Sequence, residues 1–300
     1  MRVYLTRMRK IPSAIAPGHP DYEILAEIRS AILRCVGGAD RLQEQFPALV
    51  RKAIDSVLDP VLTCRTRVTE LDNVEKTFVG LKIEHLVRDM LDVPKGLRDL
   101  VINGRDVDIK NTTGDTWMIP AETYRNEDPV LVIASEERTH RCWLGLLVTR
   151  KGYLGKPNQD KKRGVLSGAF RNIMWLVEAA PYPESRWAHL DMDRFRELRK
   201  VKGGKKRACQ FFRENLRVPM HRTVIHALLF DQDDFMKRLR ENGGARDVLK
   251  AEGIALLSGS YDAGLIAKLG LPHTGAGEMI SAAPRTAAER RLMRLQNVID

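Results

Sequence analysis

The fold of this chain is decided by residues 84–110, which read EHLVRDMLDVPKGLRDLVINGRDVDIK. The stretch begins with a helical pattern, turns at Pro94–Gly96, and continues as two short apolar runs. Asn103 and Gly104 separate these runs, and both residue types tolerate the positive φ of a tight hairpin turn. The stretch therefore predicts a helix, a turn and a two-stranded β-hairpin.

Two carboxylates and one ammonium lie on this predicted hairpin. Asp99 stands at the start of the first strand, whereas Asp108 and Lys110 lie on the second. Because alternate residues of a strand share a face, Asp108 and Lys110 project together and Ile109 points into the core. Carboxylate oxygens suit a hard divalent cation, and a lysine can hold or polarise a water molecule. The hairpin is thus a candidate cation site.

The charges alone leave a second interpretation open. Exposed strand edges often carry alternating charges, and Asp-x-Lys is frequent by chance. Glu84 adds a third carboxylate on the preceding helix, beside its apolar face. A buried carboxylate is costly unless it is paired or binds a metal, so Glu84 belongs either to the solvent surface or to the cation site.

Apolar periodicity predicts three helices before the hairpin and two buried strands after it. The helices are expected at 21–35, 39–58 and 75–91, and the strands at 130–134 and 142–149. The third helix is expected to bury Phe78, Leu81, His85 and Leu86. The region 164–182 reads as helix or turn. This order indicates an α/β fold with a mixed central sheet flanked by helices.

The chain is basic, with 50 Lys and Arg residues against 39 Asp and Glu residues and a net charge of +11. An excess of this size favours a polyanionic partner, and nucleic acid is the first candidate. A generally basic protein from a genome rich in G and C would show the same balance.

The four cysteines are far apart, which disfavours a zinc site or a disulfide framework and fits free thiols in a reducing cytosol. The first residues lack the apolar core of a signal peptide, and no stretch approaches the length of a membrane span. A cytoplasmic protein without a membrane partner is therefore expected.

Residues 151–163 combine lysines, an arginine, an asparagine and a tyrosine with glycine and proline. Such a loop suits contacts to phosphates and base edges, and Asn158, Lys162 and Arg163 are the candidates for DNA contact. A solvated basic loop is the alternative.

A helix is predicted from Asp231 to about Asn242, with Lys237 and Arg238 on its outer side. Gly243-Gly244 separates it from a second helix that begins at 245 and carries Arg246. A helix, a glycine turn and a helix are typical of a DNA-binding helix-turn-helix. Most such helix pairs, however, are plain packing.

Together these residues resemble the NaeI type of restriction endonuclease, within the PD-(D/E)xK nuclease superfamily. Asp99, Asp108 and Lys110 match the nuclease triplet, with Arg98 where the motif's name has proline. The resemblance runs in the same order over roughly residues 50–272, and its long block at 232–246 is specific. The other matching segments are 75–77, 84, 107–110, 117–120, 153–163, 252–254 and 269–272.

The resemblance implies two domains. A PD-(D/E)xK endonuclease domain with its N-terminal helices is expected at 1–180, followed by a linker at 181–202. A C-terminal DNA-binding domain of winged helix-turn-helix type is expected at 203–300, where it would hold effector DNA. The fold class is then α/β, a restriction-endonuclease-like mixed sheet with helices on its faces, plus this second domain.

The resemblance also implies a type II site-specific deoxyribonuclease. Such enzymes act as homodimers, cut both strands of double-stranded DNA at a palindromic site, and accompany a cognate DNA methyltransferase. Enzymes of the NaeI type (IIE) are activated by a second DNA copy. The implied catalytic residues are Glu84, Asp99, Asp108 and Lys110, and the implied ligands of Mg²⁺ are Glu84, Asp99, Asp108 and the Ile109 carbonyl.

Two other functions share parts of this pattern. A noncatalytic DNA-binding regulator on a nuclease-like fold would keep the basic segments but lose a carboxylate or Lys110, and none is lost. A nicking endonuclease of the MutH kind would share the catalytic residues and cut one strand. An RNA-binding module is disfavoured, because we find no paired aromatic platform.

Overall fold

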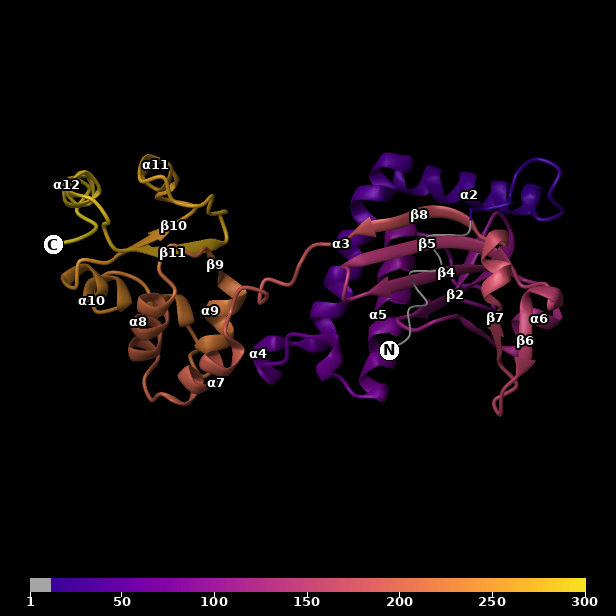
Figure 1. Ribbon diagram of the computed structural model, residues 1–300, viewed down its shortest axis with the longest axis horizontal. Coiled ribbons are helices and arrows are strands. Elements are labelled where there is room, and N and C mark those ends of the chain that lie inside the picture. The colour runs from indigo at the N-terminus through magenta and orange to yellow at the C-terminus, as the bar shows by residue number, and fades with distance from the viewer. Residues whose placement is uncertain (1–11) are drawn as a thin grey trace. The chain divides into compact units, whose positions relative to one another are not determined.

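The computed structural model describes residues 12–300, and these residues form two compact units (Figure 1). The first unit holds the residues up to Leu58 together with Arg67–Ser185, and the second holds Asp59–Thr66 and Arg186–Asp300. Residues 1–11 of the predicted first domain lie outside the described part.

The predicted linker at 181–202 is wrong in its second half. It contains helix α7 (Met192–Lys200), and Phe195 and Leu198 of this helix are buried in the core of the second unit. The charged residues that suggested a linker are the outer face of an amphipathic helix, capped by Asp191, whose side chain accepts from two backbone N–H groups.

Three long helices cover one face of the main sheet. They are α2 (Tyr22–Val36), α3 (Ala39–Leu58) and α5 (Asn73–Leu91). The first two agree with the predicted helices to within one residue. Gly37 ends α2 with a φ of 81°, a left-handed conformation that glycine adopts without steric cost. A short 3₁₀ helix, η1 (Val68–Glu70), precedes α5.

The predicted buried face of α5 is wrong. Its buried side chains are Val79, Ile83, Val87 and Leu91, whereas Phe78, Leu81 and His85 are exposed and Leu86 is half-buried. The prediction followed the larger side chains. The buried residues instead form an unbroken series of apolar side chains four positions apart. This spacing keeps all of them on the same side of a helix.

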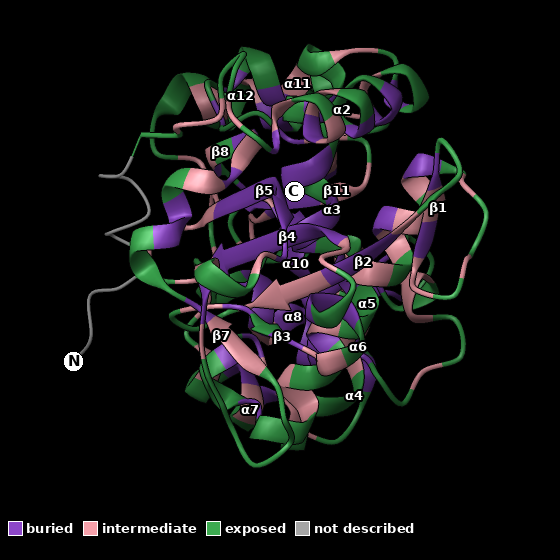
Figure 2. Cartoon of the chain, turned by 90° about the vertical axis from the view of Figure 1, so that its right-hand side faces the viewer, coloured by how far each residue is buried: buried purple, intermediate pink, exposed green. Residues whose placement is uncertain are grey.

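The main sheet has five strands in the order β1-β2-β4-β5-β8. Their bounds are β1 Leu100–Ile102, β2 Arg105–Thr112, β4 Pro129–Glu136, β5 Arg141–Val148 and β8 Met174–Pro181. β2 and β4 are parallel, and the other neighbours are antiparallel. The predicted mixed sheet flanked by helices is thereby confirmed, as are its two buried central strands, which Figure 2 shows in purple.

Strand β8 was not predicted, because 164–182 read as helix or turn. The region holds a 3₁₀ helix, η3 (Ser167–Asn172), and then β8 at the sheet edge. The pairing of β8 with β5 is interrupted by irregularities, and Ala179 has a φ of 49°. These interruptions break the two-residue alternation by which a strand is recognised in sequence.

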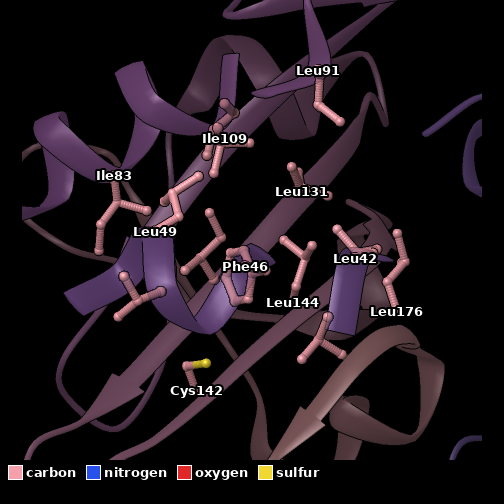
Figure 3. Close-up of a cluster of buried hydrophobic side chains, with 14 of the residues drawn as sticks. Leu42, Phe46, Leu49, Ile83, Leu91, Ile109, Leu131, Cys142, Leu144 and Leu176 are labelled. Carbon is pink, nitrogen blue, oxygen red and sulfur yellow. The ribbon is translucent and has the colours of Figure 1, made fainter. Parts of the chain in front are cut away.

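The helix-covered face carries the larger core of the first unit. Figure 3 shows Phe46 of α3 in one cluster with Leu131 of β4 and Leu144 of β5. Ile109 of β2 belongs to the same cluster and is fully buried, as predicted. Its neighbours Asp108 and Lys110 therefore project from the opposite side of the strand.

The other face of the sheet is covered by smaller elements. They are β3 (Met118–Ile119), α6 (Ala121–Arg125), η2 (Lys151–Tyr153), β6 (Leu154–Pro157) and β7 (Arg163–Val165). β3, β7 and β6 form a sheet of their own. Trp117 anchors this layer, because its indole Nε1 donates to the Ile133 carbonyl of β4 at 2.6 Å.

The second unit combines helices with a three-stranded antiparallel sheet in the order β10-β11-β9. Its strands are β9 Met220–His221, β10 Ala255–Ser258 and β11 Glu278–Ala282. Its helices besides α7 are α4 Pro60–Thr63, α8 Gly204–Glu214, α9 Arg222–Leu228, α10 Ala245–Ala251, α11 Ala263–Lys268 and α12 Ala287–Leu295.

The helix predicted from Asp231 to Asn242 is wrong. Only a 3₁₀ turn, η4 (Phe235–Arg238), forms there, although α10 begins at 245 as predicted. The side chain of Asp234 accepts from the backbone of Lys237 at 3.1 Å. Aspartate oxygens that bind nearby N–H groups in this way favour turns over helix interiors.

All four cysteines are free thiols, as predicted, and two of them, Cys142 and Cys209, are buried. Among the described residues, no helix combines the length and the apolar character that crossing a membrane requires.

Candidate active site

The hairpin predicted at Asn103-Gly104 is present. β1 and β2 pair up to Ile102 and Arg105, so two residues form the turn. Asn103 and Gly104 have φ values of 50° and 76°, the left-handed pair that a tight hairpin turn requires. The hairpin sets Asp99 beside β2, where its Oδ2 accepts from the Ile109 backbone N–H at 2.8 Å.

The loop before Asp99 is held by a side chain that was not singled out in the sequence. Asp106 Oδ1 accepts from the Leu97 backbone N–H at 2.8 Å. A Cβ at Gly96 would lie 2.0 Å from that same oxygen, so only glycine fits at this position. Asp106 and Gly96 thereby fix the approach of the chain to the first candidate carboxylate.

The structure brings Asp108, Ile109 and Lys110 together at one point. The Lys110 ammonium donates to Asp108 Oδ1 at 2.6 Å and to the Ile109 carbonyl at 3.0 Å. The second oxygen of Asp108 accepts from the Thr123 hydroxyl at 2.8 Å. Asp108 is only 4% exposed, so both of its oxygens have partners inside the protein.

Thr123 was missed by sequence reasoning. It lies on α6, within the crossover from β2 to the parallel strand β4, and it is fully buried. Nothing in a single sequence marks which crossover residue faces a given strand position. The segment around Thr123, residues 121–128, reads AETYRNED, and this mostly polar run gives no signal that the threonine is buried against a carboxylate.

The carboxyl groups of Glu84 and Asp108 hold their protons more tightly than usual, because the pKa of each is raised. Burial, with the nearby Asp99 carboxylate as the next cause, raises the pKa of Glu84 from 4.5 to about 7. Burial is also the main cause that raises the pKa of Asp108, and the neighbouring Asp99 carboxyl raises it further. Crowded, partly desolvated carboxyl groups of this kind attract a cation.

The donor groups fit a hard divalent cation. Within residues 12–300, no three His, Cys, Asp or Glu side chains form a ready metal cluster. Asp108 Oδ1 and the Ile109 carbonyl nevertheless converge on one positive group, the Lys110 ammonium. Carboxylate and carbonyl oxygens are the ligands that Mg²⁺ and Ca²⁺ take in proteins.

Replacing Glu84 by glutamine is expected to stabilise the metal-free protein at alkaline pH. Because the pKa of Glu84 is raised, the stability tied to its proton is present below 4.5 and lost as the pH passes about 7. Allowing for solvent screening, the gain in unfolding free energy is on the order of 1 kcal/mol at about pH 8.

Urea titration in EDTA, at about pH 8 and about pH 5, measures this gain. It should be present at the higher pH, small at the lower pH, and absent for Glu44→Gln, which changes an exposed residue of α3. A less stable Glu84→Gln protein at the higher pH would show that the charged form of Glu84 is favoured in the fold.

The second predicted group, at 151–163, lies on a hairpin rather than a loop. β6 and β7 form its strands, and residues 158–162 form its tip. Asn158 and Lys162 close the tip through two hydrogen bonds of 2.8 and 2.9 Å. The Arg163 guanidinium lies 4.9 Å from the centre of the Tyr124 ring. The exposed Lys162 thus stands on an ordered support.

The remaining predicted residues belong to the second unit. Lys237 and Arg238 are exposed on η4. Arg246, at the start of α10, lies 3.6 Å from Glu241 and 3.8 Å from Asp262. It lines a hollow of about 600 Å³ bounded by α9, η4 and the ends of β10 and β11.

Comparison with known proteins bears directly on this arrangement. The model of the family "Restriction endonuclease NaeI" matches residues 31–291. The chain belongs to the NaeI family of restriction endonucleases. A type II restriction enzyme, NaeI of Lentzea aerocolonigenes, is 27% identical over 285 residues, which cover 92% of this chain and 87% of that protein.

Membership of the NaeI family makes this chain a type II restriction endonuclease, a hydrolase that cleaves DNA. The match covers both units, so the family resemblance drawn from the sequence is confirmed along with the enzyme class. The roles of individual residues in the NaeI-family site stay predictions.

Proposed function

We propose that this chain cuts both strands of duplex DNA at a palindromic sequence, with Mg²⁺ as cofactor. The observation that carries the proposal is the group at Asp108. One oxygen of its carboxylate is fixed by Thr123, and the other shares a cationic group with the Ile109 carbonyl. This preorganised pair of oxygen donors beside a lysine suits metal-assisted phosphodiester hydrolysis.

Asp108, Asp99, the Ile109 carbonyl and Glu84 would hold the Mg²⁺ ion. Bound there, Mg²⁺ would stabilise the negative charge that develops on the phosphoryl oxygens. Binding through Asp108 Oδ1 and the Ile109 carbonyl would free the Lys110 ammonium, which now donates to both oxygens.

The freed Lys110 would orient the attacking water and donate to a phosphoryl oxygen. The water oxygen forms the new bond to phosphorus and gives up a proton to the solvent. The bond from phosphorus to the leaving oxygen breaks, and the leaving oxygen takes a proton from the solvent. Asp108 stays in place throughout, because its contact with Thr123 does not involve the reacting atoms.

The second unit is proposed to bind a further DNA copy as an activator. The succession α8, β9, α9, η4, α10, β10, α11, β11, with β9 at one edge of a three-stranded sheet, supports a winged-helix domain in which α11 is inserted between the last two strands. In that case α9 and α10 form the helix-turn-helix, in place of the pair expected from sequence. Lys237, Arg238 and Arg246 remain the proposed DNA contacts.

Cleavage of a supercoiled plasmid tests the proposed function. In Mg²⁺ the protein should produce linear DNA, no cleavage should occur in EDTA, and Ca²⁺ should support binding without cutting. Open circles as the final product would favour a nicking enzyme of the MutH kind. Binding without cutting in Mg²⁺ or Mn²⁺ would favour the noncatalytic regulator and overturn the proposal.

The partners can be tested with the same preparation. The chain is proposed to form a homodimer, since cutting both strands of a palindrome matches twofold symmetry. A cognate DNA methyltransferase is proposed as its functional companion. Sedimentation equilibrium should give twice the chain mass of 34.0 kDa. A monomer in this measurement would contradict the proposed homodimer. Adding a second, uncleavable duplex that carries the mapped site should accelerate cutting if effector DNA is required, and an unchanged rate would contradict activation by a second DNA copy.

A further inference from the structure

Two adjacent residues of α6 reach in different directions toward the two proposed functional groups of the first unit. The Thr123 hydroxyl donates to Asp108 Oδ2 at 2.8 Å. The Tyr124 hydroxyl donates to the Lys161 carbonyl, at the tip of the β6–β7 hairpin, at 3.2 Å. Both residues are buried, with exposed fractions of 0% and 7%, so solvent is largely excluded as an alternative partner.

Tyr124 contacts the hairpin at its tip and at the first residue of β7. Besides the hydrogen bond to the Lys161 carbonyl, its ring lies under the Arg163 guanidinium, 4.9 Å away. The tip itself is closed by the paired backbones of Asn158 and Lys162. A displacement of the tip therefore acts on Tyr124 rather than being absorbed within the loop.

α6 is also held at its far side, by contacts from Thr149 and Arg98. Thr149 Oγ1 donates to the Thr123 carbonyl at 3.2 Å and to the Asp128 carbonyl at 2.8 Å. Arg98 Nη2 donates to the Glu122 carbonyl at 2.6 Å and to the Asp128 carboxylate at 3.2 Å. Arg98 precedes Asp99 and stands where the name of the PD-(D/E)xK motif has proline. These contacts give the arginine at that position a structural role.

We infer that Thr123 and Tyr124 are positioning residues that link the orientation of the Asp108 carboxylate to the position of the 158–162 tip. The inference rests on the proposed function of both groups. A tip that is correctly placed on DNA keeps α6 in the position where Thr123 meets Asp108. Cutting then depends on the tip contact as well as on the site itself, which makes Tyr124 a determinant of specificity.

The first test removes the hydroxyl of Thr123. Thr123→Val is expected to lower the single-turnover cutting rate on a plasmid with a mapped site about tenfold to a hundredfold, as loss of a hydrogen bond to a charged acceptor predicts. DNA affinity in Ca²⁺ should stay unchanged, and Thr123→Ser should restore the rate to within about threefold. Thr123→Ala is the second variant, should the added methyl of valine prevent folding.

The second test removes the hydroxyl of Tyr124 and keeps its ring. Tyr124→Phe is expected to lower the cutting rate about threefold to tenfold. If the two residues act in one link, the double variant with Thr123→Val should be no more than about twofold slower than Thr123→Val alone. Tyr182→Phe is the matched control, because the Tyr182 hydroxyl makes no hydrogen bond within the described residues.

The outcomes separate the inference from the function on which it rests. A wild-type protein that never cuts removes the proposed function. If the wild type cuts and the Thr123→Val variant cuts at the same rate, Thr123 does not position Asp108. An unaffected Tyr124→Phe variant, or effects that multiply in the double variant, overturn the link to the hairpin tip.

Discussion

Replacement of Asp108 by asparagine should lower the rate of DNA cleavage in Mg²⁺ on the order of 10³-fold or more. The carboxylate now serves two partners, because one oxygen accepts from the Thr123 hydroxyl and the other accepts from the Lys110 ammonium. Asparagine has a single acceptor oxygen. If that oxygen meets Thr123, the amide NH₂ points at the place where a cation would bind, and the negative charge is lost as well.

The fold should survive this change. Burial raises the pKa of Asp108, so the charged carboxylate costs stability at neutral pH and a neutral amide of the same shape relieves that cost. Duplex binding in Ca²⁺ should be nearly unchanged, and Asp89→Asn, at an exposed position on α5, should cut like the wild type. A cutting rate for Asp108→Asn within about tenfold of the wild type would remove Asp108 from the catalytic site.

Reversal of two charges on the β6–β7 hairpin should weaken duplex binding about a hundredfold at ~0.15 M salt. Lys156 and Lys162 are both exposed, and neither side chain forms an ion pair within residues 12–300. Lysines that are free of protein partners keep their charge available for phosphates. Lys156→Glu with Lys162→Glu removes two such cations and adds repulsion.

The salt dependence of the affinity distinguishes this from a general reduction of charge. The slope of log K against log salt should fall by roughly 0.9 for each phosphate that the variant no longer neutralises. Arg29→Glu with Lys52→Glu makes the same charge change at exposed sites of α2 and α3, on the opposite face of the sheet, and should alter affinity much less. Equal decreases in affinity for the two double variants would mean that net charge, and not the hairpin, binds DNA.

The β1–β2 hairpin of the candidate site could be predicted because its signals are local. Asn103-Gly104 specifies the turn, and the alternation of Asp108, Ile109 and Lys110 specifies which side chains share a face. Both features depend on neighbours in sequence only, and both are present in the structure.

The contacts that complete the site depend instead on distant pairing. Thr123 reaches Asp108 because β2 and β4 are parallel and the crossover between them returns over β2. Its partner is fixed by tertiary packing, which no spacing rule encodes. The prediction of the buried face of α5 failed for a related reason. Two series of apolar residues lie on this helix, and only packing against the sheet selects the series that contains Val79 and Ile83.

The region before α10 shows a third limit. A cap at Asp231 and the apolar residues Phe235 and Leu239 predicted a helix over 231–242. Only η4 forms there, and its backbone is capped by the Asp234 carboxylate. Propensity over a short window cannot weigh such side-chain competition against helix formation. The charged residues Lys237 and Arg238 were nevertheless correctly expected at the surface.

The path of the backbone through the second unit limits how its parts can be exchanged between relatives. Residues Asp59–Thr66 belong to that unit although they precede most of the first, and Val61 and Cys64 pack against its core. A chimera that receives only residues 186–300 from one parent would keep residues 59–66 of the other parent. The core of its second unit would then combine side chains from two different proteins. An exchange of the second unit between relatives therefore has to move both segments together, which requires three junctions in place of one.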